Sequence, residues 1–303
     1  MQPKLEGYVA ARLGPLERTV LAAVARDFAA LEQTILGNAD LHGLLTDTSI
    51  NPVARGQVLG DLLVGKVADL TVDLAVYAAV EVRPQEVPHA VAELASSIHL
   101  RQETGVVQFA SLGLLAARER VCGYADALLD DVTSDNFTEI EHDLFRWAHI
   151  VRNNNELRRL LTDRDAPLEE RLGITRSLLE GKVHEIALAL ACFVIVGGRP
   201  RDVTGSIDHL VDYIAQARDW RIARIHSAQP LDEASRAQLV ASLMAVTGRS
   251  VELQVAQDPS LLGGLLIEVG DLRLDATTRG RLGALRDAVA SGRLYESALN
   301  RND

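Results

Sequence analysis

The residues whose types and spacing come closest to a chemical site lie at Gly60–Val67, where the sequence reads GDLLVGKV. This stretch contains G-x-x-x-x-G-K, as a phosphate-binding loop does, but Val67 stands where that loop needs Ser or Thr. The preceding PVARGQVLGDLL has apolar residues at helical spacing, whereas a phosphate loop follows a strand. Gly65 then falls where a glycine ends a helix, and Lys66 lies near the negative end of the helix dipole. We therefore interpret GDLLVGKV as a helix end and disfavour a nucleotide site.

Other residues that could do chemistry are isolated. His142 and His149 share an expected helix, but two helical turns put them about 10 Å apart, too far to hold one metal ion without other ligands. Cys122 and Cys192 lack C-x-x-C spacing and predict neither a disulfide framework nor a zinc site. The sequence has no G-x-S-x-G element, and Gly263-Gly264 do not form G-x-G-x-x-G. We expect no catalytic residues, no metal site and no cofactor.

The composition favours a packed, helical and acidic protein. The chain has 303 residues, of which 48% are hydrophobic and only 4% aromatic, and its net charge is −11. An acidic surface repels phosphate backbones, so a nucleic-acid partner is disfavoured. The most apolar stretch, Ile186–Val196, has about half of the ~20 residues that a membrane helix needs, and it is expected to be a buried core helix. We expect no membrane span in this chain.

An internal repeat organises the first two thirds of the chain. LLTDTSINPVARGQVLGDLLVGKV starts at Leu44, and LLTDRDAPLEERLGITRSLLEGKV starts at Leu160. The same offset aligns residues 8–115 with 124–231 without a gap, and roughly a quarter of the pairs are identical, as expected of an old duplication. In the second copy Arg176 replaces Gly60, while LLxGKV is kept. The repeat therefore supports the helix-end interpretation of GDLLVGKV.

Each copy reads as five or six helices, which predicts a compact bundle. After about residue 220 the pattern changes to two strands (RIARIHSA and SVELQVAQ), the helix DEASRAQLVASLMAVTG between them, a hairpin LLIEVGDLRLD and a last helix ATTRGRLGALRDAVAS. The predicted fold class is mainly α with a small α+β part. It consists of a first bundle at residues 1–115, a second bundle at 116–218 and a C-terminal α+β domain at 219–303.

The C-terminal residues DPSLLGGLLIEVGDLRLDATTRGRLGALRDAV, at 258–289, closely resemble the signature of the ATP synthase delta subunit, the bacterial counterpart of the oligomycin-sensitivity-conferring protein. That pattern is D-x-S-(L/I)-(L/I)-G-G, an apolar run, G-D and then D-G-S-x-R-G-R-L. This sequence departs from it at Ala276, where the family usually has glycine. The residues that match the pattern are Asp258, Ser260, Gly263, Gly264, Gly270, Asp271, Asp275, Arg279, Gly280, Arg281 and Leu282.

The resemblance covers about residues 116–292, because YADALLD at Tyr124 is similar to the family's opening helix. The additional bundle in front resembles the long, actinobacterial type of delta subunit. Some of those are fused behind a membrane-anchored b-type stalk helix, and this sequence shows no such helix. Two alternatives stay open: a separate long delta subunit, or a piece of a b-delta fusion.

The resemblance implies a non-catalytic peripheral-stalk (stator) subunit of the proton-translocating F-type ATP synthase, at the cytoplasmic face of the bacterial plasma membrane. The implied partners are alpha subunits, with beta subunits as a further candidate, and a b-type stalk subunit. In the family, a groove between the first and fifth helices of the bundle holds alpha N-terminal helices. Carried over, the residues of that groove would be Tyr124, Leu128, Leu129, Ile186, Leu190, Phe193 and Val194.

The signature residues would be structural or would bind the stalk. Gly270 would form the hairpin turn with Asp271, and Gly263-Gly264 would allow a bend or a close approach. Arg279 and Arg281 would pair with acidic groups or cap the hairpin. The alternative function is a free-standing helical adaptor that binds amphipathic helices of unrelated partners, but such an adaptor has no reason to keep this signature.

Overall fold

The computed structural model describes residues 1–14, 16–104, 109–130, 132–163, 165–247, 251–258, 261, 263–269 and 272–279. The chain forms two compact units, Met1–Ala215 and Gln216–Asp303. The first unit contains both helical bundles, and the second contains a small sheet. This confirms the predicted fold class, mainly α with a small α+β part.

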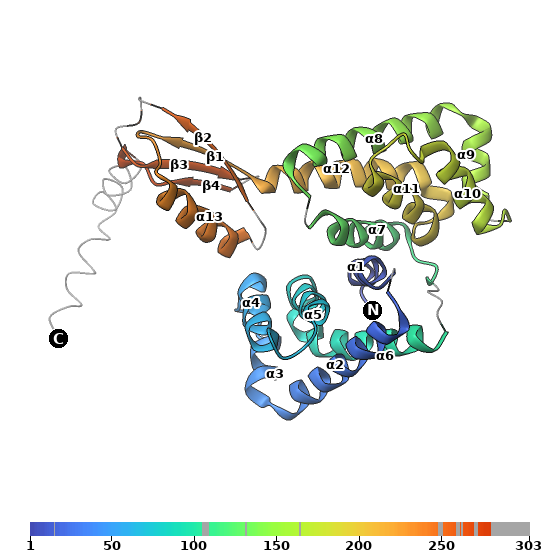
Figure 1. The fold of residues 1–303 in the computed structure, drawn as a ribbon, viewed down its shortest axis with the longest axis horizontal. Coiled ribbons are helices and arrows are strands. Elements are labelled where there is room, and N and C mark those ends of the chain that lie inside the picture. The colour runs from blue at the N-terminus through green and yellow to red at the C-terminus, as the bar shows by residue number, and fades with distance from the viewer. Residues whose placement is uncertain are drawn as a thin grey trace. The chain divides into compact units, whose positions relative to one another are not determined.

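The duplication is visible in the helix bounds (Figure 1). The first copy contains α1 (Pro3–Leu13), α2 (Arg18–Gly37), α3 (Ala39–Thr46), α4 (Pro52–Leu63), α5 (Asp69–Glu81) and α6 (Val87–Thr104). The second copy contains α7 (Leu114–Leu129), α8 (Ser134–Asn153), α9 (Asn155–Thr162), α10 (Leu168–Leu179), α11 (Glu185–Gly197) and α12 (Val203–Arg221). Helices α2 to α5 begin and end at the positions equivalent to those of α8 to α11. Short 3-10 turns, Pro84–Glu86 and Pro200–Asp202, also match.

One helix start is capped in the same way in both copies. The side chains of Asn38 and Asn154 accept hydrogen bonds from the first backbone N–H groups of α3 and α9, which satisfies donors that have no partner inside the helix. This cap is kept in both copies, whereas the fourth helix is capped by Asn51 in the first copy and begins after Pro167 without a side-chain cap in the second.

The stretch GDLLVGKV is the end of α4. Gly65 has φ 73° and its counterpart Gly181 has φ 71°, a left-handed conformation that costs glycine little. Lys66 Nζ donates to the Leu62 carbonyl at 2.7 Å, and Lys182 Nζ donates to Leu178 at 3.0 Å. The predicted helix end is confirmed, and Lys66 is engaged in capping it.

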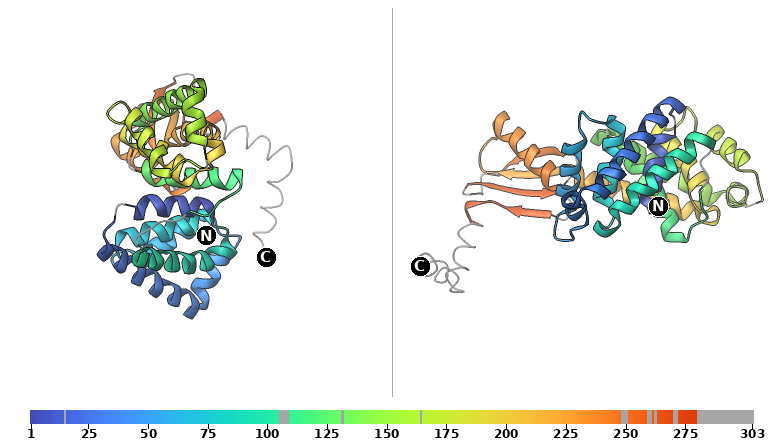
Figure 2. Two further views of the ribbon diagram at one scale, coloured as in Figure 1. Left: turned by 90° about the vertical axis from the view of Figure 1, so that its right-hand side faces the viewer. Right: turned by 90° about the horizontal axis from the view of Figure 1, so that it is seen from below.

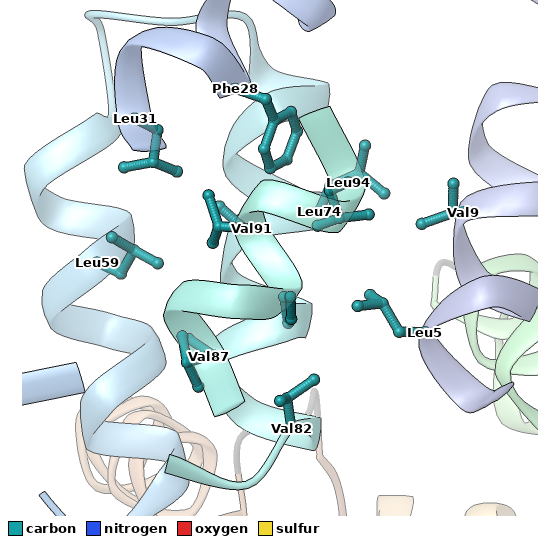
Figure 3. Packing of buried hydrophobic residues seen from close by; sticks show 14 of the residues in the cluster. Leu5, Val9, Phe28, Leu31, Leu59, Leu74, Val82, Val87, Val91 and Leu94 are labelled. Atoms are coloured by element: carbon teal, nitrogen blue, oxygen red, sulfur yellow. The ribbon is translucent and has the colours of Figure 1, made fainter. Parts of the chain in front are cut away.

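The core of the first bundle is aliphatic and comes from all of its long helices (Figure 3). Leu5 of α1, Phe28 of α2, Leu59 of α4 and Leu74 of α5 are each fully buried. In the second bundle α11 supplies the centre of the core, as its apolar sequence predicts, with Leu190 and Val194 at 0% exposure. Burial of such side chains contributes about 1.5–3 kcal/mol each, which is why an aliphatic composition suffices for both bundles.

The two bundles meet where α1 packs along α7 (Figure 1). The crossing point is formed by Gly7 and Gly123, which are equivalent residues of the two copies. A Cβ on Gly7 would overlap the carbonyl oxygen of Arg120, and a Cβ on Gly123 would overlap that of Lys4. Lys4 and Arg120 are themselves equivalent, so the contact is pseudo-symmetric, and only glycine lets the backbones approach so closely.

Polar contacts surround this crossing. Asp126 of α7 accepts hydrogen bonds from Tyr77 Oη at 2.7 Å and Tyr213 Oη at 2.6 Å, and Lys4 Nζ lies 3.3 Å from it. Burial lowers the pKa of the Lys4 ammonium, but the nearby Asp126 and other acidic groups outweigh that effect and leave the pKa raised. Between the same two helices, Arg120 Nη1 of α7 donates to the Glu6 carboxylate of α1 at 3.1 Å. The bundles are therefore joined by charged partners on both sides of the glycine crossing.

The second unit has strands β1 (Ile222–Ser227), β2 (Glu252–Gln257), β3 (Leu265–Val269) and β4 (Leu272–Asp275), in the order β2-β1-β3-β4. Strands β1 and β2 are parallel and are connected through α13 (Glu233–Thr247), while β3 and β4 form the antiparallel hairpin that the sequence predicts. Helix α13 covers one face of the sheet (Figure 2), and its Leu243 belongs to the same buried cluster as Ile225 and Val269. Most of the predicted last helix lies outside the described residues.

We expect Gly123→Ala to destabilise the first unit by about 1–3 kcal/mol, because the added methyl group forces α1 away from α7. The matched control is Gly173→Ala in α10, where an added Cβ meets no atom within 4 Å. That variant should be more stable by about 0.5–1 kcal/mol through helix propensity. Urea unfolding followed by far-UV circular dichroism measures both, and equal midpoints would contradict the close crossing.

Candidate functional site

A groove lies on the second bundle, along α11. It has a volume of about 380 Å³ and is bounded by α7 on one side and α10 on the other. Its lining runs from Glu185 to Val196 of α11, which is about 16 Å or three helical turns. We call it the α10–α11 groove. Its lining residues are Tyr124, Leu172, Arg176, Glu185, Leu188, Ala189, Cys192, Phe193 and Val196.

Stacked aromatic rings form the α7 side of the groove. The rings of Tyr124 and Phe193 lie 3.7 Å apart and are tilted by only 8°. Phe109, from the segment before α7, meets Phe193 edge-on at 5.5 Å, and the Arg120 guanidinium lies 4.9 Å above Phe109. Because Arg120 also donates to the Gly197 carbonyl at 2.7 Å, this side is held to the end of α11. The aromatic side of the groove is thus fixed before any partner arrives.

The remaining lining is apolar with two charges. Leu188 and Ala189 are half-buried on α11, and Leu172 packs from α10 with 6% exposure. Arg176 reaches from α10 over Cys192: burial raises the pKa of that thiol, and the hydrogen bond and positive charge of Arg176 lower it in part. Glu185 lies at the start of α11. An apolar groove with a cation from α10 and an acidic residue at the start of α11 suits an amphipathic helix whose own charges complement these two.

The structure places the seven residues predicted for a groove in three environments. Tyr124 and Phe193 line the α10–α11 groove. Leu128 and Ile186 are half-buried and outside its lining. The other three, Leu129, Leu190 and Val194, are buried within the bundle.

Sequence reasoning missed the wall contributed by α10. Leu172 and Arg176 line the groove, but the family expectation named only the first and fifth helices of the bundle. A signal for these two residues exists in the repeat, because the first copy has Gly56 and Gly60 at the same positions. A change from glycine to two large side chains on one helix face marks a place where the copies differ in packing.

In the second unit, the signature residues Gly263, Gly264 and Asp275 lie where the segment before β3 meets the segment after β4. Gly263 and Gly264 have φ 152° and 83°, and Gly264 faces the Ala276 carbonyl so closely that no Cβ fits. Asp275 accepts hydrogen bonds from Thr277 N at 2.9 Å and Oγ1 at 2.6 Å, and these bonds lower the pKa of its carboxyl. Arg279 is the last residue of the described part of the chain, and its side chain is exposed. The remaining predicted positions, Ser260, Gly270, Asp271 and Arg281, lie outside the described residues.

The glycine pair opens onto a second hollow, of about 630 Å³, within the second unit. Its lining comes from residues 227–231 after β1, from residues 263–265 and from α13. The α13 side chains include Leu239, Gln238 and the hydroxyls of Ser235 and Ser242. This hollow therefore combines an apolar centre with hydrogen-bonding groups.

Neither hollow contains a recognisable catalytic arrangement. Within the ranges that the structure describes, no cluster of three His, Cys, Asp or Glu residues is placed to hold a metal ion. Across the same residues, no helix is both long and apolar enough to cross a bilayer.

Comparisons with a family model and with individual proteins all find similarity to the same family. The model of the ATP synthase delta (OSCP) subunit family matches residues 122–289, which begin within α7 and comprise most of the second bundle and most of the C-terminal unit. The ATP synthase subunit delta of Parafrankia sp. (strain EAN1pec) is 29% identical over 287 residues, 93% of each chain. That of Salinispora tropica is 28% identical over 274 residues, 90% of each chain. That of Thermobifida fusca is 34% identical over 151 residues, 50% of this chain and 56% of the relative.

The two cysteines provide a direct test of the groove. We expect the Cys192 thiol to react slowly with iodoacetamide at neutral pH and faster as the pH rises, because its pKa is raised by burial. Burial raises the pKa of Cys122 to about 12, so this thiol should react only after unfolding in urea. Cys122→Ser and Cys192→Ser variants identify the modified residue by mass spectrometry. Modification of Cys122 first in the native chain would contradict the packing of α7.

Proposed function

Because this chain belongs to the ATP synthase delta (OSCP) subunit family, we propose that it fastens the catalytic head of an F-type ATP synthase to the end of the b-type stalk. A member of this family is a non-catalytic structural subunit of the peripheral stalk. The proposal adds the attachments at the two ends, and it places the chain at the cytoplasmic face of the bacterial plasma membrane.

At the head, the proposed occupant of the α10–α11 groove is the N-terminal helix of an alpha subunit. The observation that carries this assignment is the open, three-turn apolar lining along α11, with Arg176 as its cation. A helix of matching length buries one apolar face there, and the stacked pair Tyr124 and Phe193 offers it a rigid surface. Beta subunits that neighbour the alpha N-termini are further candidates for contact.

At the other end, the proposed partner of the C-terminal unit is the b-type stalk. The hollow beside Gly263-Gly264 supports this, because family signature residues border a surface with both apolar and hydrogen-bonding groups. The free-standing adaptor is disfavoured, because the family match extends through this unit to residue 289.

The work of such a subunit is mechanical. Rotation of a central shaft turns the head unless a stator holds it, so the stator needs binding energy and stiffness and no turnover. Apolar docking supplies the binding energy. The polar contacts around Asp126 supply stiffness, because each of the two tyrosine hydroxyls and Lys4 is held by the same carboxylate.

We expect Leu188→Asp to weaken the complex between this chain and the catalytic head of its own ATP synthase at least tenfold. The substitution places a charge in the apolar lining, and a tenfold loss corresponds to about 1.4 kcal/mol. The complex is measured by biolayer interferometry with the chain immobilised. Deleting the N-terminal helix of the alpha subunit should cause a loss of similar size.

The matched control is Leu178→Asp on α10, where the leucine is 39% exposed and outside the groove lining. It introduces the same charge and should leave affinity within twofold of the unmodified chain. Equal affinity of the Leu188→Asp variant and the unmodified chain would refute docking in this groove.

A further inference from the structure

The two bundles share a fold but differ where the groove lies. On one side of the fifth helix they agree: Tyr8 stacks on Tyr77 at 3.7 Å and 9°, as Tyr124 stacks on Phe193 in the second copy. The difference lies on the other side, between α4 and α5 in the first copy and between α10 and α11 in the second. There the residues of the fourth helix that face the fifth helix are glycines in the first copy and large side chains in the second.

In the first copy, glycines bring α4 onto α5. A Cβ on Gly56 would lie 2.6 Å from Val80 Cγ2, and a Cβ on Gly60 would lie 3.3 Å from Val76 Cγ2. Both distances are tighter than ordinary van der Waals contact, so the α4 backbone itself rests on the α5 side chains. Val76 and Val80 are the counterparts of Cys192 and Val196, which line the open groove of the second copy.

In the second copy, Leu172 and Arg176 stand in place of these two glycines. Leu172 is almost fully buried, and the Arg176 side chain lies beside Cys192. Side chains of this length do not fit at the spacing of α4 and α5, where a Cβ on Gly56 would already overlap Val80 and one on Gly60 would press on Val76. Helix α10 therefore stands off from α11, and the lining between the two helices stays accessible.

We propose that Leu172 and Arg176 are the residues that hold this groove open for a partner helix, and that Gly56 and Gly60 close the equivalent place in the first copy. The two copies then have different tasks: the second receives a helix at this position, and the first supports α7 through the Gly7–Gly123 crossing. The occupant, the alpha N-terminal helix, rests on the proposed function. The role of the two spacer residues rests on the packing alone.

The groove selects its occupant by length and charge. The accessible lining along α11 spans three turns, so a longer apolar face would gain no further contact. Arg176 lies over the middle of that lining, at Cys192, so an acidic residue on the partner helix would meet it directly. The first copy has Asp73 at the place of Ala189, and Arg12 Nη2 lies 4.0 Å from that carboxylate, so the charges along the fifth helix differ between the copies.

The test compares the full chain with its Leu172→Gly/Arg176→Gly variant. The probe is a synthetic peptide of the N-terminal helix of the alpha subunit from the same ATP synthase, and binding is measured by isothermal titration calorimetry. The unmodified chain should bind one peptide at this position, and the variant should bind at least tenfold more weakly. Undiminished binding by the variant would overturn the inference.

Two further variants control for the cost of glycine in a helix. Glu169→Gly/Ser177→Gly changes two exposed positions of the same helix outside the groove lining, and it should bind as the unmodified chain does. If the double-glycine variant does not fold, Leu172→Ala/Arg176→Ala gives the same comparison with smaller side chains left in place, and a loss of about threefold or more is expected because the bulk is only partly removed.

A crystal structure of the double-glycine variant separates this inference from the proposed function. Helix α10 should approach Cys192 and Val196 of α11 as α4 approaches Val76 and Val80 of α5. An unmoved α10 would overturn the spacer role, whatever the peptide does. If the peptide fails to bind the unmodified chain while α10 moves in the variant, the proposed occupant is wrong and the spacer role stands.

Discussion

The close crossing of α1 and α7 at Gly7 and Gly123 is the contact on which the arrangement of the first unit depends. Gly7 lies against the carbonyl of Arg120, and Gly123 lies against the carbonyl of Lys4, which is the residue equivalent to Arg120. A contact that repeats itself in this way resembles the interface of a two-fold dimer, here built within one chain. Any side chain larger than hydrogen at either position would force the helices apart and separate the charged groups around them.

Through this crossing, one helix takes part in both bundles. One face of α7 packs on α1, while Tyr124 of the same helix stacks on Phe193 and forms a side of the groove. The carboxylate of Asp126 adds a polar anchor, with Tyr77 and Lys4 from the first copy and Tyr213 from the second. Burying such a group is costly without partners, so these hydrogen bonds favour one alignment of the two bundles over others. The first copy thus stiffens the wall at which the second is proposed to bind.

Duplication followed by divergence accounts for how one fold gained two roles. The cap of the third helix by Asn38 or Asn154, the left-handed glycines and the aromatic ring stacks are present in both copies, because each depends on one or two residues that the fold itself needs. Packing between the fourth and fifth helices carries no such requirement. A glycine-lined contact and an open groove are both compatible with the bundle, so the packing between the fourth and fifth helices could change while the rest of the bundle stayed constant.

The duplication, the end of α4, the strands of the second unit and the family can all be inferred from the sequence, because repeats, alternating strands and the signature are patterns along the chain. Gly65 and Lys66 could be interpreted correctly without any knowledge of their surroundings. The sequence does not separate groove from core on α11, which is apolar nearly all round: Phe193 lines the α10–α11 groove, while Leu190 and Val194 lie inside the bundle. The meeting of Gly7 and Gly123, and the place of Leu172 and Arg176 in the groove lining, appear only in the folded chain. Both results depend on which helix faces stand opposite each other, and no periodicity within one helix contains that information.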